Sequence, residues 1–167
     1  MVAKPIIAAE KAVELIKEGD TVMVGGFLGC GSPPALIDAL EKKGTRNLTL
    51  VCNDTAFLNF KTGTCTHVAK LVAKKQFRKI VVSHIGTNQE TQRQMNEGET
   101  EVVLVPQGTL AERIRAAGAG LGGVLHPTGV GTEVQEGKQV LDVDGRKFLL
   151  EKALPGNVAL LKAKKAD

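Results

Sequence analysis

The stretch Thr21-Val-Met-Val-Gly-Gly-Phe-Leu-Gly-Cys-Gly-Ser-Pro-Pro34 predicts a strand that leads into a glycine loop and then into a helix. Thr21–Val24 is a short apolar run of strand-forming residues. Four of the seven residues in Gly25–Gly31 are glycine, a composition that permits a tight turn or a close approach of the backbone to a ligand. Ser32 suits an N-cap and Pro33 suits a first helical position, so we expect a helix to begin there.

The same order of strand and helix repeats along the chain. Apolar runs predict further strands at Asn47–Cys52, Lys79–Ser83, Glu101–Val105 and Asn157–Leu161. Helical patterns lie at Ala8–Glu18, from Ser32 to Gly44, near Thr66–Lys75, from Thr87 to Glu97 and from Thr109 to about Ala117. The last two open with capping-box spacing, Thr87 with Glu90 and Thr109 with Glu112.

These patterns together predict the fold class. Near-continuous apolar strands that alternate with helices are typical of a buried, largely parallel sheet. Val140–Leu150 alternates around Asp144-Gly145, a strong signal for a hairpin. We therefore predict an α/β fold with a largely parallel open sheet flanked by helices and a β-hairpin added near the C-terminus.

Length and composition narrow the class of protein. A chain of 167 residues fits a single domain, 1–167. The net charge is +4, but Lys and Arg alternate with Asp and Glu, which is typical of a solvated surface rather than of nucleic-acid binding. Tyr and Trp are absent, which disfavours base stacking. No run approaches the roughly 18 apolar residues of a membrane span, and no signal sequence is recognisable, so we expect a cytoplasmic protein without membrane or nucleic-acid partners.

Cysteine and histidine spacing gives no sign of a metal site or a disulfide framework. The cysteines are Cys30, Cys52 and Cys65, and the histidines are His67, His84 and His126. An odd number of widely spaced cysteines favours reduced thiols. The scattered histidines lack ligand spacing. We therefore expect no bound metal.

The glycine loop is the strongest candidate site, because open α/β sheets bind ligands at the carboxyl ends of their strands. It nearly matches a P-loop, but Ser32-Pro33 stands where that motif needs Lys and Ser or Thr, so nucleotide hydrolysis is disfavoured. A dinucleotide fingerprint fails because Pro34 replaces the third glycine after Gly29 and Gly31. From spacing alone, a plain turn and a ligand loop are equally supported.

Other strand ends carry polar residues whose roles stay open. Cys30 in the loop is either a nucleophile or a packed small residue, and packing is the commoner role. His84 is either a proton carrier or, as the pattern favours, a packed or capping residue. Asn53-Asp54 and Gln107 follow strands, where an amide holds a ligand carbonyl or, more commonly, caps the next helix.

Six segments of this sequence form a recognisable series of motifs. They are Val24-Gly-Gly-Phe-Leu-Gly-Cys-Gly-Ser-Pro33, Asn53-Asp-Thr-Ala56, Ser83-His-Ile-Gly-Thr-Asn88, Val105-Pro-Gln-Gly-Thr-Leu-Ala-Glu-Arg-Ile-Arg115, Gly118-Ala-Gly-Leu-Gly122 and Pro127-Thr-Gly-Val-Gly-Thr132. In this order they resemble the alpha (A) subunits of the family I 3-oxoacid CoA-transferases, among them bacterial acetate/acetoacetate/butyrate CoA-transferase A subunits. The resemblance extends from about Glu10 to the last residue.

The resemblance implies a function. Family members transfer CoA between carboxylic acids by a ping-pong reaction in which a glutamate of the beta subunit becomes acylated and then carries CoA. The Ser-Glu-Asn-Gly motif of that glutamate is absent here. This chain is then expected to bind CoA, a substrate rather than a permanent cofactor, through the loop residues Gly25, Gly26, Phe27, Leu28, Gly29, Cys30 and Gly31. Asn53 and Gln107 are expected to complete the acyl pocket, and the expected assembly is an A2B2 heterotetramer.

Two features depart from the family pattern. Family chains continue beyond the strand at Val158, so we expect this chain to lack C-terminal elements. Thr62–Gln76 is also longer and more basic than the resemblance leads us to expect, which suggests altered partner contacts or an altered cleft rim.

Two other functions remain open from the sequence. The same fold type resembles that of phosphosugar isomerases and transcriptional sensor domains, so a non-catalytic ligand-sensing or sugar-phosphate-binding module is the main alternative. A purely structural partner subunit is the other.

Overall fold

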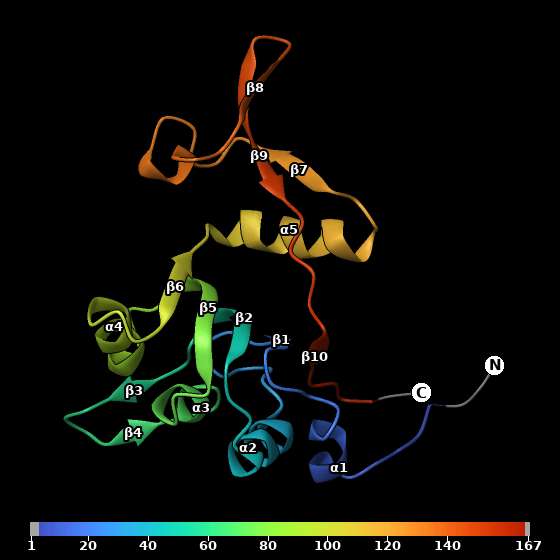
Figure 1. The fold of residues 1–167 in the computed structure, drawn as a ribbon, viewed down its shortest axis with the longest axis vertical. Helices are drawn as coiled ribbons and strands as arrows, with labels where there is room; N and C mark the ends of the chain where they lie inside the picture. Colours follow the sequence, from blue (N-terminus) through green and yellow to red (C-terminus); the bar gives the residue numbers. More distant parts are fainter. Residues whose placement is uncertain (1–3, 166–167) are drawn as a thin grey trace. The chain divides into compact units, whose positions relative to one another are not determined.

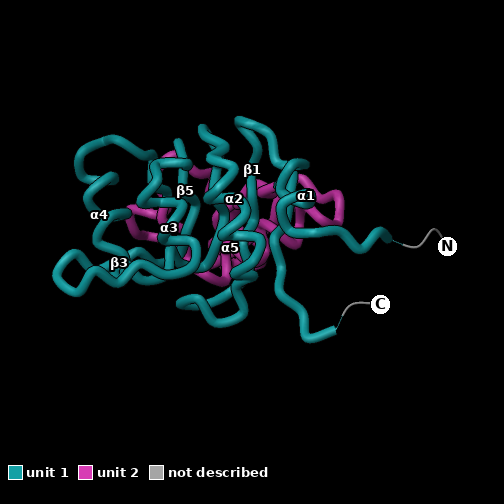
Figure 2. The backbone as a smooth tube through the Cα atoms, turned by 90° about the horizontal axis from the view of Figure 1, so that it is seen from below, with its two compact units in different colours: residues 1–103, 156–167 teal, residues 104–155 magenta. Residues whose placement is uncertain are grey.

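The computed structural model describes residues 4–165 and divides the chain into two compact units. Unit 1 contains the chain up to Val103 and again from Gly156, and unit 2 runs from Leu104 to Pro155. The two units are coloured separately in Figure 2.

Unit 1 is built on a five-stranded sheet (Figure 1). Its strands are β1 (Thr21–Val24), β2 (Leu48–Asp54), β5 (Phe77–His84), β6 (Glu101–Leu104) and β10 (Val158–Leu160), in the order β10-β1-β2-β5-β6. β1 pairs in parallel with both β10 and β2, and β2 pairs in parallel with β5. Six of the seven residues of β2 are buried, which explains why its sequence is almost continuously apolar.

Four helices pack in sequence order in unit 1, each against the next (Figure 2). They are α1 (Ala9–Val13), α2 (Pro34–Lys43), α3 (Ala69–Ala73) and α4 (Gln89–Asn96). A short antiparallel pair, β3 (Leu58–Asn59) with β4 (Thr64–Cys65), precedes α3. The core joins α1, α2 and α3 to the sheet, and its fully buried side chains include Ile37, Leu40, Leu50, Leu71 and Ile80.

Unit 2 has a three-stranded antiparallel sheet and one long helix (Figure 1). The elements are α5 (Gln107–Gly118), β7 (Gly123–His126), the 3₁₀ turn η1 (Glu133–Gln135), β8 (Val140–Val143) and β9 (Arg146–Lys152). The strand order is β7-β9-β8, and α5 packs against β7 and β9. Asp144 and Gly145 both have left-handed backbone angles, with φ of 53° and 77°, as a two-residue hairpin turn requires.

The predicted fold class is confirmed: a parallel sheet flanked by helices carries an antiparallel hairpin late in the chain. The predicted strands are all present to within two residues at each end. Within residues 4–165, no helix is long and apolar enough to cross a membrane.

The predicted helix starts are wrong in three places. α2 begins at Pro34 with Pro33 as its N-cap, while Ser32 is buried one residue earlier. Asn88, not Thr87, caps α4 by accepting a hydrogen bond from the backbone N–H of Thr91. α5 begins at Gln107, because Thr109 is buried in the first turn and bonds His126 instead of capping.

Two predicted helices are shorter than expected, and three strands are absent from the prediction. α1 ends at Val13, although Ile16 beyond it is still buried, and α3 covers only Ala69–Ala73. β3, β4 and β7 are short or begin at a glycine, so they lack the apolar run by which the other strands were predicted.

Candidate functional site

The loop Gly25–Gly31 leaves the carboxyl end of β1 and forms a tight internal turn. The backbone N–H of Phe27 donates to the carbonyl of Cys30 at 2.9 Å, and that of Cys30 donates back to Phe27 at 2.8 Å. Gly29 and Gly31 have φ of 87° and 82°, in the left-handed region that glycine adopts without strain. The glycines at these two positions are thus required by the backbone path.

Four of the seven loop amides are already used inside the protein. Gly25 donates to the carbonyl of Leu160, Phe27 and Cys30 bond each other, and Leu28 donates to Asp54. Among the residues that the structure describes, the amides of the remaining glycines, Gly26, Gly29 and Gly31, meet no acceptor. Gly26 and Gly31 are exposed, whereas Gly29 is buried. The loop therefore presents two accessible backbone donors to a ligand.

Asp54, the last residue of β2, holds the glycine loop in place by hydrogen bonds. Its buried carboxylate accepts from the backbone N–H of Leu28 and of Ala56, both at 2.8 Å, and from the Asn53 side chain at 2.9 Å. Charge-assisted bonds of this kind are the stronger ones in a protein. Sequence reasoning placed Asp54 at a strand end but did not single it out, and the family-matching Asn-Asp-Thr-Ala segment was the only signal.

Asn53 is largely committed to neighbouring groups. Its amide N donates to Asp54, and the Ser83 hydroxyl donates to its side-chain oxygen at 3.1 Å and to its backbone carbonyl at 2.7 Å. Asn53 is also the penultimate residue of β2, not a residue after the strand. One amide hydrogen is left for a ligand.

His84 closes the same edge of the sheet, where it lies opposite Asp54 in the parallel register of β5 and β2. It is exposed and its side chain makes no hydrogen bond with another described residue, so it does not cap a helix. A Cβ on Gly86 would lie 2.8 Å from its Cε1 atom. The chain thus folds back closely over the imidazole.

The three thiols are in different environments. Cys30 is exposed, so its favoured interpretation as a packed residue is also wrong. Burial, with the nearby Asp54 charge, raises the pKa of the Cys52 thiol far above its usual value. Burial and the charge of Glu41 raise the pKa of Cys65. Cys52 and Cys65 are therefore held as neutral thiols at pH 7.

Gln107 lies in unit 2, as the first residue of α5. It is exposed, and its side chain makes no hydrogen bond with any other residue in the described range. The favoured interpretation, that it caps the helix, is therefore wrong, and its amide is free for a ligand.

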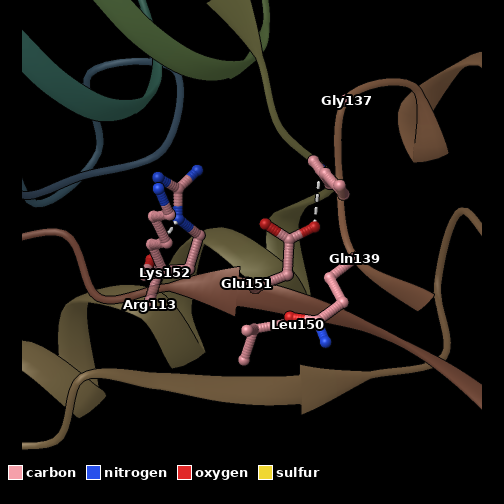
Figure 3. Close-up of a pocket in the computed structure, with 7 residues that line it drawn as sticks. Arg113, Gly137, Gln139, Leu150, Glu151 and Lys152 are labelled. Atoms are coloured by element: carbon pink, nitrogen blue, oxygen red, sulfur yellow. Dashed lines mark hydrogen bonds and ion pairs between the residues drawn. The ribbon is translucent and has the colours of Figure 1, made fainter. Parts of the chain in front are cut away.

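A cavity of about 390 Å³ in unit 2 has no counterpart in the sequence predictions (Figure 3). Glu151 lies in it with only 2% of its surface exposed, and the Lys138 ammonium pairs with it at 2.6 Å. Arg113 donates to the carbonyl of Lys152 at 2.8 Å. Nothing in the sequence distinguished this buried ion pair from surface charges. Across residues 4–165, no group of three or more His, Cys, Asp or Glu side chains is placed to hold a metal ion.

A parallel sheet with a glycine loop at its carboxyl edge is typical of α/β proteins that bind a ligand there. Comparison with known proteins identifies the family. A family model described as coenzyme A transferase matches residues 6–167. The chain is 50% identical over 162 residues to the acetate CoA-transferase subunit alpha of Escherichia coli K12, covering 97% of this chain and 71% of that protein. It is 44% identical over 162 residues to the acetoacetyl-CoA:acetate/butyrate CoA transferase alpha subunit of Clostridium acetobutylicum, covering 97% of this chain and 72% of that protein.

Solved structures agree on the fold. The crystal structure of an acyl-CoA transferase of Escherichia coli O157:H7, in a thioester complex with CoA, superposes with a TM-score of 0.79 at 23% identity. It covers 93% of this chain, which in turn spans 33% of that longer chain.

The chain belongs to the coenzyme A transferase family. The resemblance and the enzyme class predicted from the sequence are confirmed, and both relatives described above are alpha subunits. The non-catalytic alternative is not favoured.

Proposed function

We propose that this chain is the alpha subunit of a cytoplasmic heteromeric enzyme that moves CoA between a short-chain acyl-CoA and acetate, acetoacetate or butyrate. The names of the Escherichia coli and Clostridium relatives support this substrate range. The observation that carries the proposal is the glycine loop at the carboxyl end of β1, with accessible amides at Gly26 and Gly31.

The loop is proposed to bind CoA through these two amides. Backbone N–H groups that converge in a glycine-rich turn attract anionic and carbonyl oxygens. Asp54 supports this role because it holds Leu28, and with it the turn, in one conformation before a ligand arrives. Phe27, with 61% of its surface exposed, is proposed to cover an apolar part of the same ligand.

The covalent chemistry is proposed to use a glutamate of the beta subunit. Its carboxylate attacks the acyl-CoA carbonyl, the thiolate of CoA leaves, and an acyl-glutamyl anhydride forms. The thiolate then attacks the glutamyl carbonyl and releases the carboxylic acid as its carboxylate, which leaves a glutamyl-CoA thioester; the second carboxylic acid reverses these steps. Dividing the exchange into two covalent steps lowers the barrier to each.

Gln107 and Asn53 are proposed to act on the acyl group. An amide donor stabilises the oxyanion that forms when the carbonyl is attacked. Gln107 is better suited, because its side chain is not bonded within the described chain, whereas Asn53 keeps only one free amide hydrogen.

The proposal is tested by copurification. The chain is expressed with an affinity tag in its native host, the partner that copurifies is identified, and transfer of CoA from acetoacetyl-CoA to acetate is measured. We expect the partner to carry a Ser-Glu-Asn-Gly motif and the complex to be active. A stable complex that binds CoA but transfers none would instead assign this chain to a binding role.

A further inference from the structure

The segment Thr62–Gln76 stands out in the sequence, and the proposed function does not use it. Its two ends are fixed in unit 1. At its start, Cys65 pairs with Leu58 across the β3–β4 hairpin, and the backbone N–H of Thr66 donates to the carbonyl of Phe57 at 3.0 Å. At its end, the buried side chain of Gln76 donates to the carbonyls of Leu40 and Thr45. Both ends of the segment are therefore anchored to the rest of unit 1 by hydrogen bonds.

The anchored segment places the imidazole ring of His67 against Gly29 of the glycine loop. A Cβ built on Gly29 would lie 2.2 Å from the Cδ2 atom and 2.6 Å from the Nε2 atom of the His67 ring. Gly29 is buried even though the residues on either side of it are not. The imidazole thus occupies the space that a side chain at position 29 would fill.

The backbone at His67 is itself unusual. Its φ of 49° lies in the left-handed region, which is uncommon for a residue with a side chain. Such a conformation persists where the surrounding structure determines it. Here the backbone N–H of Lys70 donates to the His67 carbonyl at 3.1 Å, and the buried Val68 follows directly.

Two neighbouring residues of the loop are therefore held from two different elements. Asp54 of β2 holds Leu28 by a hydrogen bond, and His67 holds Gly29 by packing. A cavity of about 290 Å³ borders His67, Cys65 and Lys70. The three atoms nearest to a Cβ at position 29 all belong to the His67 ring, so the ring is the main contact of that position.

We propose that His67 is a positioning residue that holds Gly29 in its left-handed conformation and thereby places the ligand-facing amides of the loop. The proposal rests on the proposed function only for the identity of the ligand, CoA. Removing the ring frees the turn, and the Gly31 amide, two residues further on, loses its fixed direction. We expect CoA affinity to fall about tenfold, short of the roughly hundredfold that a 1 Å misplacement of a reacting group costs.

The first experiment compares His67→Ala and His67→Asn in the complex with the partner subunit. Asn tolerates a left-handed backbone but lacks the imidazole ring. His67→Asn therefore keeps the backbone conformation at position 67 and removes only the contact with Gly29. We expect both variants to raise the Kd and KM for CoA about tenfold, with little change in kcat. Thr62→Ala is the control. Thr62 lies in the same segment, and among the described residues its hydroxyl bonds only Thr64, so this variant should match the wild type. Wild-type affinity in His67→Asn would overturn the proposal.

A second measurement does not depend on CoA. In the chain labelled with ¹⁵N-glycine, His67→Asn should shift the amide signals of Gly29 and Gly31, whereas the signal of Gly145, in the hairpin turn of unit 2, should stay in place. Unchanged Gly29 and Gly31 signals would refute the positioning role. Shifted signals in a protein that never binds CoA would keep the positioning role and refute the proposed function.

A double-mutant cycle tests the contact directly. Gly29→Ala must displace the ring in the wild type, but not in His67→Ala, while the backbone strain of Ala at position 29 is the same in both. We expect Gly29→Ala to cost less stability in the His67→Ala background, since contacting residues are not additive. Additive effects would show that the two residues are uncoupled.

Discussion

Asp54 accepts hydrogen bonds from the backbone of two segments, Leu28 in the glycine loop and Ala56 just after β2. Ala56 is itself left-handed, with φ of 57°. One carboxylate at a strand end therefore joins two turns that would otherwise be independent. At the residue scale, the site is shaped by which amides are used within the fold and which are left for a ligand.

Gly31→Ala tests the loop as a ligand site. The added Cβ has room, since its nearest neighbour is the Cα of Gly26 at 3.7 Å, but φ of 82° costs a residue with a side chain about 1–2 kcal/mol. We expect weaker CoA binding by calorimetry on the assembled enzyme, because the turn relaxes away from this angle. Gly145→Ala has the same strain in open space, at φ of 77°, and is the matched control. Equal CoA affinity in both variants would contradict the assignment.

Gln107→Ala tests the proposed oxyanion donor. We expect kcat to fall tenfold or more, within the roughly 10²–10³ range for the loss of one such donor, while KM changes little. Glu112→Ala, on the same helix and paired only with Arg115, should leave kcat unchanged. A variant that loses only thermal stability would assign Gln107 a structural role.

Single residues differ in how well the sequence predicts them. The positions of the glycine loop and of the amides at strand ends follow from apolar runs that end at glycine or asparagine. The anchoring role of Asp54, the contact of His67 with Gly29 and the exposure of Cys30 and His84 do not follow. They depend on which side chains from distant segments meet in space, and local pattern carries no information about that.

The charges on α4 and just beyond its C-terminal end form a network around one side chain. Arg93 pairs with Glu90, with Glu97 and with Glu99, the last two at one end of the helix. Lys75, from the end of the α3 segment, pairs with Glu99 at 2.8 Å. Hydrogen bonds from Arg93 and Lys75 lower the pKa of Glu99 to about 2. The network ties α4 to the segment that carries His67.

The network predicts how stability depends on pH. The pKa of Glu99 is lower in the folded protein than its usual value of 4.5, so its contribution is complete above that value and is lost as pH falls toward 2. We expect Arg93→Ala to lower the free energy of unfolding at pH 7. The difference in this free energy between the variant and the wild type, the gap, should close between about pH 4.5 and pH 2. Urea unfolding across this range measures the gap. Arg78→Ala, an exposed residue without an ion pair in the described chain, should show no such closing, and a pH-independent gap for Arg93→Ala would exclude the network.

Helices and strands were predictable from the sequence where the spacing of apolar residues and the length of the segment both indicated the same kind of element. β2 and β5 are long and buried, so their patterns are unambiguous. The helix starts were predicted from Ser and Thr, but the backbone uses Pro33, Asn88 and Pro106 at those positions. Capping-box spacing favours a start only when the residue is free to leave the core, and Thr109 is fully buried.

At the scale of the molecule, the proposed function requires a second kind of subunit. We expect the purified chain alone to show no CoA transfer, because the thiols of Cys52 and Cys65 are kept neutral by burial and the sequence lacks the Ser-Glu-Asn-Gly motif of the proposed nucleophile. Mixing with the beta subunit should produce activity, and native mass spectrometry should show two copies of each chain. Cys30→Ser is the control: if the isolated chain turns over and this variant does not, the nucleophile lies here.

The fold class and the family were predictable from the whole sequence, because six motifs in one order specify both. The division into two compact units was not. The single domain expected from the length stays a prediction, since a soft relation between chain length and domain number does not locate where contacts are sparse.

β10 lies at the edge of the unit 1 sheet, beside β1. Its position determines when this sheet can be completed during synthesis. β10 pairs with β1, and the backbone N–H of Thr21 bonds the side chain of Asn157, which is 136 residues away along the chain. A ribosome therefore produces β1 early and must extrude all of unit 2 before β10, the second neighbour of β1, emerges. Until then one border of the nascent sheet has unsatisfied backbone groups, the state in which unpaired strands recruit other chains. For this protein, the vulnerable interval of biogenesis lasts from the emergence of β1 until β10 has left the ribosome.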